Sequence, residues 1–407
     1  MTATLTVLFW LAAGLLAYTY VGYPGLMALV ARFRPRMIRK GPIRPRVTLL
    51  IVAHNEASRL EAKLQNCLAL DYPRDRLEIV VASDGSADGT VEVTRRYEHD
   101  GVRVLAFETR RGKPSVLNDV VPEARGEIVV LADARQTFHR EALVALVENF
   151  HDPAVGAVSG ELVLDEQATA VGEGVGFYWR YEKFIRSRES CFDSTVGATG
   201  AIYAIRRDLF EPIPADTLLD DVVIPLRVCR RGYRVVFEPG AKAFDRAAES
   251  AEEEFTRKVR TIGGNVQLLG RERWVWSIRQ NRLWFQTVSH KFLRLVAPLL
   301  LGVAFVTSAA VSPVAPVYRA ALVGQLLFYG AALAALFVGD VPRVGRWLAV
   351  PYAFCLLNWT TVVGVTRFLS GAQTVTWRKA SGSAANRAGR PGMSRGGGLW
   401  ARRRSRG

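Results

Sequence analysis

The sequence predicts an α/β protein with a mostly parallel sheet that is flanked by transmembrane helices. Between residues 47 and 132, short apolar runs alternate with segments of helical periodicity, an order that is typical of a parallel sheet. Charge-free apolar stretches lie before and after this region, and each is about one bilayer span, roughly 20 residues, long. A chain of 407 residues is long enough for one large core together with such spans.

The first apolar stretch runs from about Thr4 to Val30, and residues 1–31 carry no charged side chain. It lacks the basic region that begins a cleavable signal peptide, so we expect an uncleaved anchor rather than the alternative, a buried core helix. Basic residues follow at once, at positions 32, 34, 36, 39, 40, 44 and 46. Because basic clusters mark the cytoplasmic side of a span, the sequence predicts an integral protein of the cell (inner) membrane with its N-terminus outside and its main domain in the cytoplasm.

The region after the anchor is expected to alternate between strands and helices. Apolar runs predict strands at 47–53, 77–82, 102–105 and 127–132. The segments between them predict helices through Leu60, Leu64 and Leu68, from about 88 to 97, and from 113 to 121. Residues 155–245 look mixed, with strands at 155–158 and 235–237, a helix near 177–188 and a glycine-rich turn at 197–200. We therefore expect one cytoplasmic domain over residues 47–249.

The C-terminal part is expected to return to the membrane. Residues 250–292 look amphipathic and carry Trp274, Trp276 and Trp284 among Arg and Lys, which suits a helix at the membrane interface. Three charge-free stretches follow within the expected transmembrane region 293–368, at 295–318, 320–338 and 347–366. Four spans would leave the basic tail, 369–407, outside the cell, so the last stretch, with Pro351 and Asn358, is alternatively re-entrant. The tail itself is expected to be disordered.

The basic balance of the chain, a net charge of +16 with a sequence pI near 10.1, is concentrated beside the apolar stretches. Nine basic residues and no acidic residue follow Trp377. This placement favours contact with anionic membrane lipids over nucleic acid, because no nucleic-acid-binding motif accompanies the charge. The four cysteines are scattered, without a Cys-x-x-Cys pair or a His/Cys cluster, which argues against a zinc site or a disulfide framework.

Acidic residues follow or adjoin three apolar runs of the cytoplasmic domain. They are Asp84 before a glycine, Asp133 after a buried run, and the pair Asp220-Asp221. In open α/β sheets, ligands bind in the crevice at the carboxyl ends of the strands. Taken singly, Asp84 is as well explained as a turn residue, and Asp220-Asp221 as an acidic helix start. Three such acidic motifs in series, each beside an apolar run, predict a nucleotide-sugar and metal site.

Residues 47–265 resemble a family 2 glycosyltransferase with the GT-A fold. The resemblance is carried, in order, by His54-Asn55-Glu56, Asp84-Gly85, Gly112-Lys113 with Leu117-Asn118, Asp133, Asp220-Asp221 and Arg257-x-x-Arg260. With the flanking spans, it is closest to the membrane-embedded branch that includes cellulose, hyaluronan and poly-N-acetylglucosamine synthases and ceramide-type glucosyltransferases. The family implies a GT-A nucleotide-sugar-binding domain flanked by transmembrane helices.

The resemblance assigns the donor-binding residues, with a UDP-sugar as the expected donor. His54, Asn55 and Glu56 stand where the family contacts the nucleotide base and ribose, and Asp84-Gly85 where it binds the nucleoside. Lys113 can neutralise diphosphate charge, although a solvated lysine is the alternative. Arg260 aligns with an arginine that binds diphosphate, and Arg257 replaces a glutamine in the same motif.

The resemblance also implies a divalent cation, Mg²⁺ or Mn²⁺. Asp133 occupies the first position of the family's Asp-x-Asp motif, where carboxylate and diphosphate oxygens hold the metal against the leaving nucleoside diphosphate. The second acidic position is Arg135 here. The metal then has one protein carboxylate in this motif, or Arg135 supplies charge directly.

The resemblance assigns the acceptor side to two further motifs. Of the pair Asp220-Asp221, Asp221 is expected to be the general base that takes a proton from the acceptor hydroxyl. Thr199-Gly200 stand where the family has its acceptor-side loop. Thr261 replaces a tryptophan on which an acceptor sugar stacks in processive relatives, which argues against long-chain processivity.

The function implied is that of an inverting, metal-dependent hexosyltransferase that moves a sugar from a nucleotide-sugar donor to a growing exopolysaccharide. A membrane-lipid acceptor is the alternative, and a catalytically inactive scaffold is an alternative of another class. Because few apolar stretches are available to build a channel, export of a polymer would call for a partner subunit or a homo-oligomer.

Overall fold

The computed structural model of the chain describes residues 1–165, 170–246, 251–338 and 345–372. Most of the expected basic tail, 369–407, lies outside these residues. The described strands form one sheet in the order β3-β2-β1-β4-β7-β6-β8-β5. Their bounds are β1 Val47–Ala53, β2 Leu77–Asp84, β3 Val102–Phe107, β4 Ile128–Ala132, β5 Thr137–Phe138, β6 Val155–Asp165, β7 Ile202–Arg206 and β8 Arg234–Arg246.

The sheet is mostly parallel, as expected for a GT-A domain. Strands β3, β2, β1 and β4 run parallel to one another, and β6 is parallel to β8. Strand β7 is antiparallel to both β4 and β6 and joins the two parallel groups, and the short β5 is antiparallel to β8. All four parallel strands from β3 to β4 therefore deliver their carboxyl ends to one edge, where the ligand crevice of an open α/β sheet lies.

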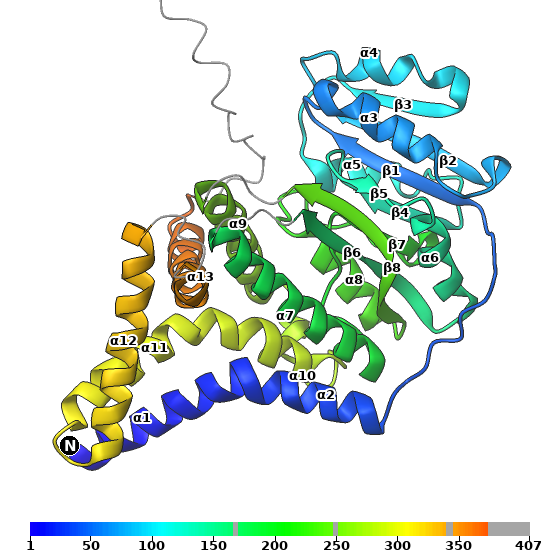
Figure 1. Cartoon of the computed structure of the whole chain (residues 1–407). Coiled ribbons are helices and arrows are strands. Elements are labelled where there is room, and N and C mark those ends of the chain that lie inside the picture. Colours follow the sequence, from blue (N-terminus) through cyan, green and yellow to red (C-terminus); the bar gives the residue numbers. More distant parts are fainter. Residues whose placement is uncertain (166–169, 247–250, 339–344, 373–407) are drawn as a thin grey trace, which may run out of the picture. The chain divides into compact units, whose positions relative to one another are not determined.

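Helices cover both faces of the sheet and enclose two apolar cores (Figure 1). One core lies against α3 (Ala57–Leu68) and α6 (Ala142–Glu148), and the other against α5 (Lys113–Val120) and α8 (Asp220–Arg230). On β1, Leu49 and Ile51 belong to the first core and Leu50 to the second, because successive side chains of a strand point to opposite faces. The central strand is thus buried on both faces, which is why its sequence is a continuous apolar run.

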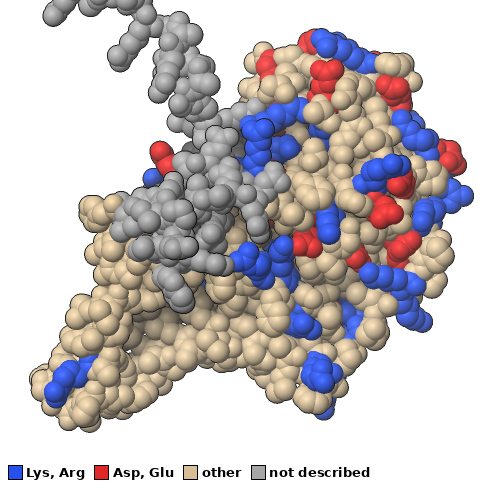
Figure 2. All heavy atoms as spheres, viewed as in Figure 1, with Lys and Arg blue, Asp and Glu red and all other residues tan. Residues whose placement is uncertain are grey.

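Among the described residues, four helical segments are long and apolar enough to cross a membrane: Thr2–Phe33, Trp284–Val311, Pro316–Ala335 and Leu348–Leu369. They comprise α1 (Thr2–Ala17) and α2 (Tyr23–Phe33), α10 (Trp284–Gln286) and α11 (Leu293–Val311), α12 (Pro316–Val338) and α13 (Gly345–Leu369). Charged side chains are spread over the sheet domain in Figure 2, whereas the visible face of these helices is almost uncharged. The apolar helices account for a membrane association of the protein.

The segment between the anchor and β1 is fixed to the sheet domain by its basic residues. Arg36 pairs with Asp193 at 2.7 Å, Arg44 pairs with Glu148 at 3.3 Å, and Lys40 pairs with Glu238. Part of the positive cluster is therefore used to hold this segment along the domain. Basic residues that form ion pairs within the protein are weaker evidence for membrane orientation than unpaired basic residues would be.

Two further helices connect the sheet domain to the membrane helices: α7 (Ala170–Phe192) and α9 (Ala251–Arg271). Helix α13 packs on both of them. Gly364 of α13 lies against Ile262 and Val259 of α9, where a Cβ atom would fall 2.7 Å from Ile262. The glycine therefore allows a close helix crossing at this point.

The structure departs from the expected elements in several places. Strand β7 and helix α6 are not evident from the sequence, because a short apolar run gives no clear period. Residues 250–292 are not one interface helix: α9 ends at Arg271, and a membrane segment already begins at Trp284. The stretch 295–318 contains the turn between α11 and α12. Residues 347–366 belong to one continuous helix, α13, which runs through Pro351 and favours a span over the re-entrant alternative.

Candidate functional site

The loops after β1 and β2 are joined at the edge of the sheet. His54 Nδ1 lies 2.7 Å from the carbonyl oxygen of Asp84, and the Asn55 Oδ1 atom accepts a hydrogen bond from the Ala87 amide at 2.8 Å. The Glu56 amide donates to Thr90 Oγ1 at 2.9 Å. Asn55 adopts a left-handed backbone with φ of +56°. These contacts bring the expected nucleoside-binding residues of the two loops side by side.

The carboxylate of Asp84 holds the loop that precedes α5. It is buried, and its two oxygens accept hydrogen bonds from the Arg111 amide at 2.7 Å and the Gly112 amide at 2.9 Å. Gly85 has a φ of +60°, and a side chain there would meet the backbone of Arg110. In this structure, Asp84 and Gly85 therefore position the start of α5, where Lys113 lies.

Lys113 lies between two of the expected acidic residues. Its Nζ atom is 3.1 Å from Asp133 Oδ1 and 3.2 Å from Asp220 Oδ2. Burial favours the neutral amine, but the neighbouring carboxylates outweigh it and raise the pKa of Lys113. Burial likewise opposes the charge on Asp133, and Lys113 outweighs it and lowers the pKa of that carboxyl. Lys113 and Asp133 thus form a charged pair at neutral pH.

Asp220 and Asp221 begin α8, and the glycine-rich loop before β7 folds against them. The Gly200 amide donates to Asp221 Oδ2 at 2.9 Å, and the Ala198 amide donates to the Asp221 carbonyl at 2.7 Å. The Thr199 amide donates to Ser159 Oγ at 3.1 Å. The structure therefore brings the expected base and the expected acceptor-side loop into direct contact.

The pKa of Asp221 is shifted in the opposite direction from the pKa of Asp133. Burial and the neighbouring Asp220 raise the pKa of Asp221 to about 6, although Lys113 acts in the opposite direction. A carboxylate with a raised pKa is a better proton acceptor near neutral pH. Two carboxyl groups whose pKa values are pushed apart within one site are typical of acid–base chemistry.

Tyr203 is a further residue of the site that no sequence motif indicated. It is fully buried on β7, and burial together with Asp220, Asp221 and Asp133 raises its pKa well above the ordinary value. The Tyr203 phenol therefore stays protonated at neutral pH. The available signal was a hydroxyl within an apolar run, but that run was not recognised as a strand.

Arg135 does not stand alone at the second position of the acidic motif. Its Nη2 atom pairs with Asp245 Oδ2 of β8 at 2.9 Å, and the Gln136 side chain donates to the same oxygen at 3.0 Å. The described residues contain no group of three or more His, Cys, Asp or Glu placed to hold a metal ion. Asp133 fits a divalent cation that takes most of its ligands from a bound diphosphate, as Mg²⁺ commonly does.

Helix α9 supplies the expected arginines and supports the segment that leads to α8. Arg260 Nη2 lies 3.5 Å from the Leu218 carbonyl, and its positive charge also acts on Asp133. Arg257 lies one turn earlier on the same helix and is half-buried. Gln267 accepts a hydrogen bond from the Leu218 amide at 2.8 Å. The start of α8 is therefore held directly by α9.

Gly264 gives a test of this support. A Cβ atom there would meet Leu219, the residue before Asp220, and Leu218 at 3.2 Å. We expect Gly264→Ala to displace this segment and to lower the turnover number about tenfold, although alanine is the better helix former by ~1 kcal/mol. Gly270→Ala on the same helix is the matched control, since no described residue outside the adjoining helix backbone lies within 4 Å of its Cβ position. The measurement is the turnover number of both variants in steady-state kinetics. Equal turnover numbers would show that the contact between position 264 and Leu219 is unimportant for activity.

Comparison with known proteins agrees with this geometry. Residues 48–213 match the family model "Glycosyl transferase family 2". A poly-beta-1,6-N-acetyl-D-glucosamine synthase of Staphylococcus aureus (strain COL) is 25% identical over 232 residues, 56% of this chain and 56% of that protein. The probable glycosyltransferase YdaM of Bacillus subtilis (strain 168) is 27% identical over 241 residues, 54% and 55% of the two chains. The chain spans about half the length of these curated relatives.

A solved structure extends the likeness to the membrane helices. The mannosyltransferase PcManGT from Pyrobaculum calidifontis, in complex with GDP-Man and Mn²⁺, has a TM-score of 0.67 and 26% identity. The likeness covers 90% of this chain and 100% of that chain. Together with the order and direction of the strands, it identifies the fold of the sheet domain as GT-A. Residues 48–213 are therefore similar in sequence to family 2 glycosyltransferases.

Proposed function

We propose that the protein is an inverting, metal-dependent membrane hexosyltransferase that moves a sugar from a nucleotide-sugar donor to a growing exopolysaccharide. The observation that carries this proposal is the cluster of Lys113, Asp133, Asp220 and Asp221 at the edge of the sheet. It combines a cation for the leaving group, a charged carboxylate for a metal and a carboxylate with a raised pKa. These are the groups that transfer of an activated sugar needs.

The donor would lie across the loops after β1, β2 and β4. His54, Asn55, Glu56 and Asp84 would hold the nucleoside, and Lys113 and Arg260 would face the diphosphate. A divalent cation bound by Asp133 would supply further neutralisation of charge on the leaving diphosphate. Lys113 would then exchange part of its contact with Asp133 and Asp220 for the phosphate oxygens.

The acceptor would approach from the side of Thr199 and Gly200. Its hydroxyl oxygen forms the new bond to the anomeric carbon while the bond from that carbon to the diphosphate oxygen breaks. Asp221 takes the hydroxyl proton, and the nucleoside diphosphate leaves with the bonding electron pair. One displacement of this kind inverts the configuration at the anomeric carbon.

The acceptor class is supported by the S. aureus relative, which is named as a polysaccharide synthase. One observation favours a membrane-lipid acceptor instead. Thr261 of α9 is exposed, and its hydroxyl donates to the Arg257 carbonyl at 3.1 Å, so no aromatic platform for a sugar stands at this position. A UDP-sugar is the proposed donor, and export of a polymer would involve a partner subunit or a homo-oligomer.

The test is to incubate membranes containing the protein with a panel of radiolabelled nucleotide sugars and Mg²⁺ or Mn²⁺. Label in a high-molecular-weight fraction, resistant to chloroform–methanol extraction, would support an exopolysaccharide acceptor. A single sugar on an extractable lipid would support the alternative. Absence of transfer from every donor, with intact nucleotide binding, would favour the inactive scaffold.

We also propose that the domain faces the cytoplasm of a cell with the protein in its inner membrane. A cysteine introduced at Glu98, in a variant whose exposed Cys191 is replaced by serine, should be inaccessible to an impermeant maleimide on intact right-side-out cells. It should react fully after permeabilisation, which is the control. Labelling of intact cells would place the domain outside and reverse the proposed topology.

A further inference from the structure

Lys63 is a buried charge to which the proposed reaction gives no role. It lies on α3 among Leu60, Leu64 and Cys67, at the spacing of the core face of a helix, and it is 1% exposed. Burial lowers the pKa of Lys63 from 10.5 to about 8, so most of the side chain is still charged at neutral pH. An apolar residue would fill this position at a lower cost in free energy. A lysine on this face is therefore explained by what its ammonium group contacts.

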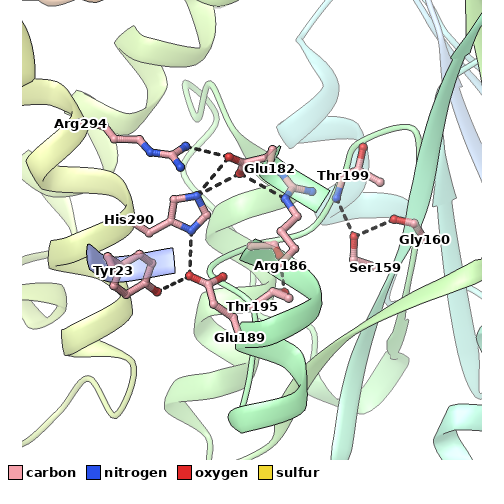
Figure 3. Close-up of polar contacts among 11 residues, drawn as sticks. Tyr23, Ser159, Gly160, Glu182, Arg186, Glu189, Thr195, Thr199, His290 and Arg294 are labelled. Carbon is pink, nitrogen blue, oxygen red and sulfur yellow. Dashed lines mark hydrogen bonds and ion pairs between the residues drawn. The ribbon is translucent and has the colours of Figure 1, made fainter. Parts of the chain in front are cut away.

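Another group of buried charges, between α7 and two membrane segments, is accounted for by pairing within the protein (Figure 3). Glu182 lies 3.1 Å from His290 and 2.7 Å from Arg294. Glu189 accepts a hydrogen bond from Tyr23 at 2.5 Å and lies 2.8 Å from the same histidine. The carboxylates of this cluster are thus compensated where they are buried, and the cluster joins the helices.

The ammonium group of Lys63 instead faces the segment that follows β4. Within the described part of the chain, no carboxylate forms an ion pair with it. Its Nζ atom donates to the carbonyl oxygen of Gln136 at 2.8 Å and lies 3.3 Å from the centre of the Phe138 ring. Both contacts of this buried charge are therefore made just beyond Asp133 along the chain.

The loop between β4 and β5 has a buried side and an exposed side. Ala134 and Gln136 are 7% and 1% exposed, whereas the side chains of Asp133 and Arg135 are 38% and 23% exposed. The exposed Asp133 is the carboxylate that contacts Lys113 at 3.1 Å. The loop therefore rests with its buried side on the core that α3 covers and holds its charged side chains on the side of the donor cluster.

Other contacts keep this loop attached without Lys63. Asn66 of α3 accepts a hydrogen bond from the Phe138 amide at 2.7 Å and donates to the Phe138 carbonyl at 2.9 Å. The Gln136 side chain donates to Asp245 of β8 at 3.0 Å. Strand β5 should thus stay in place when the ammonium group of Lys63 is removed. What the lysine adds is a fixed position for the Gln136 carbonyl, between the site carboxylate and the strand.

We propose that Lys63 is a positioning residue of the donor site, which holds the Gln136 carbonyl from the buried side and so fixes Asp133 and Arg135 toward the metal and diphosphate of the donor. This inference rests on the proposed function, because it concerns the carboxylate that would bind the metal. Residues behind a metal ligand orient it, and their loss typically lowers metal affinity by roughly 10–100-fold. A side chain that is costly to the fold is expected where the site needs it.

The test is Mn²⁺ binding by the full-length protein in detergent in the presence of UDP, measured from the electron paramagnetic resonance signal of free Mn²⁺. Lys63→Met keeps an unbranched side chain but removes the ammonium group. It should raise the apparent Kd for Mn²⁺ about tenfold, at the low end of the range for such residues, since the other contacts of the loop remain. Its Tm should stay within a few degrees of the parent's, because loss of the hydrogen bond and relief of a buried charge act in opposite directions.

Cys67→Ala is the matched control on the same face of α3. Cys67 is fully buried one helical turn after Lys63, so its truncation should leave a small cavity and lower the Tm. Because it removes no contact with the Gln136 carbonyl, it should leave Mn²⁺ binding at the parent level. A purely structural role of the lysine predicts instead that Lys63→Met lowers the Tm at least as much as Cys67→Ala and that the folded protein binds Mn²⁺ as the parent does.

Transfer kinetics separate positioning from a general loss of activity. Lys63→Met should need about tenfold more Mn²⁺ for half-maximal rate and should keep kcat within a few-fold of the parent at saturating Mn²⁺. Parent-like Mn²⁺ binding in Lys63→Met, equal weakening in Lys63→Met and Cys67→Ala, or a large loss of kcat that excess Mn²⁺ does not restore would each overturn the inference. A parent protein that binds Mn²⁺ with UDP but transfers no sugar would overturn the proposed function alone. A parent that binds no Mn²⁺ with UDP would overturn both.

Discussion

Replacing Asp221 with asparagine should abolish sugar transfer while leaving nucleotide binding nearly intact. Asparagine keeps the shape of the side chain and can still accept the hydrogen bond from the Gly200 amide, but it cannot take the acceptor proton. Loss of a general base lowers turnover by roughly 10²–10⁴-fold. Single-turnover transfer assays and calorimetric titration with the nucleoside diphosphate measure the two effects separately.

The same variant should be more stable than the parent at pH 7.5. The pKa of Asp221 is about 6 in the folded protein, above the ordinary value, so ionisation of this group weakens the folded state as pH rises through about 6. The neutral asparagine removes this penalty at pH 7.5 and changes little below about pH 4. A higher Tm at pH 7.5 together with lost turnover would separate a missing base from a misfolded protein.

Asp220→Asn is the control for the identity of the base. Asp220 pairs with Lys113 at 3.2 Å, so its loss should mainly weaken the lysine position and lower turnover less than Asp221→Asn. A larger loss in Asp220→Asn would move the base one residue earlier. Turnover of Asp221→Asn within a few-fold of the parent would exclude Asp221 as the base.

Replacing Asp133 with alanine should remove both activity and the response to added Mg²⁺ or Mn²⁺. Asp133 is the carboxylate that faces Lys113 at the edge of the sheet, and its pKa is lowered, so it is charged and able to bind a hard cation at neutral pH. We expect transfer to fall by at least 10²-fold, as for other losses of transition-state charge stabilisation. Initial rates across a metal titration measure this effect.

Asp119→Ala is the matched control for the loss of a carboxylate near the same helix. Asp119 pairs with Arg111 at 2.6 Å on the exposed side of α5, so this variant should keep the activity and metal response of the parent. Full activity of the parent in excess chelator would contradict a metal-dependent mechanism. Lys113 and Arg260 would then supply the neutralisation of the leaving diphosphate.

The first half of the fold was predictable because its strands are buried on both faces. The apolar run of β1 was predicted with its observed bounds, and the strand–helix alternation that follows predicted a mostly parallel sheet, as found for β3, β2, β1 and β4. The antiparallel β7 was not predictable from local pattern, since it pairs with β4 and β6 across long stretches of sequence. Tyr203 was missed together with its strand.

The contacts of the site were less predictable than its residues. The family resemblance singled out Lys113, Asp133 and Asp220 as site candidates, but their mutual distances depend on the joining of the two sheet halves. Trp274, expected on a helix at the membrane interface, is instead buried in the core of the sheet domain, with Arg230 over its ring at 5.1 Å. The buried cluster of Tyr23, Glu189 and His290 could not be predicted from the sequence, because its members lie on three segments separated by more than a hundred residues.

The most direct test of the proposed reaction is the anomeric configuration of the product. The full-length protein would be incubated with the donor that the panel identifies, and the first-formed product would be examined by NMR, with Asp221→Asn as the blank. A single displacement assisted by Asp221 predicts a linkage of opposite configuration to that of the donor. A product that retains the donor configuration would contradict the mechanism and the role given to Asp221.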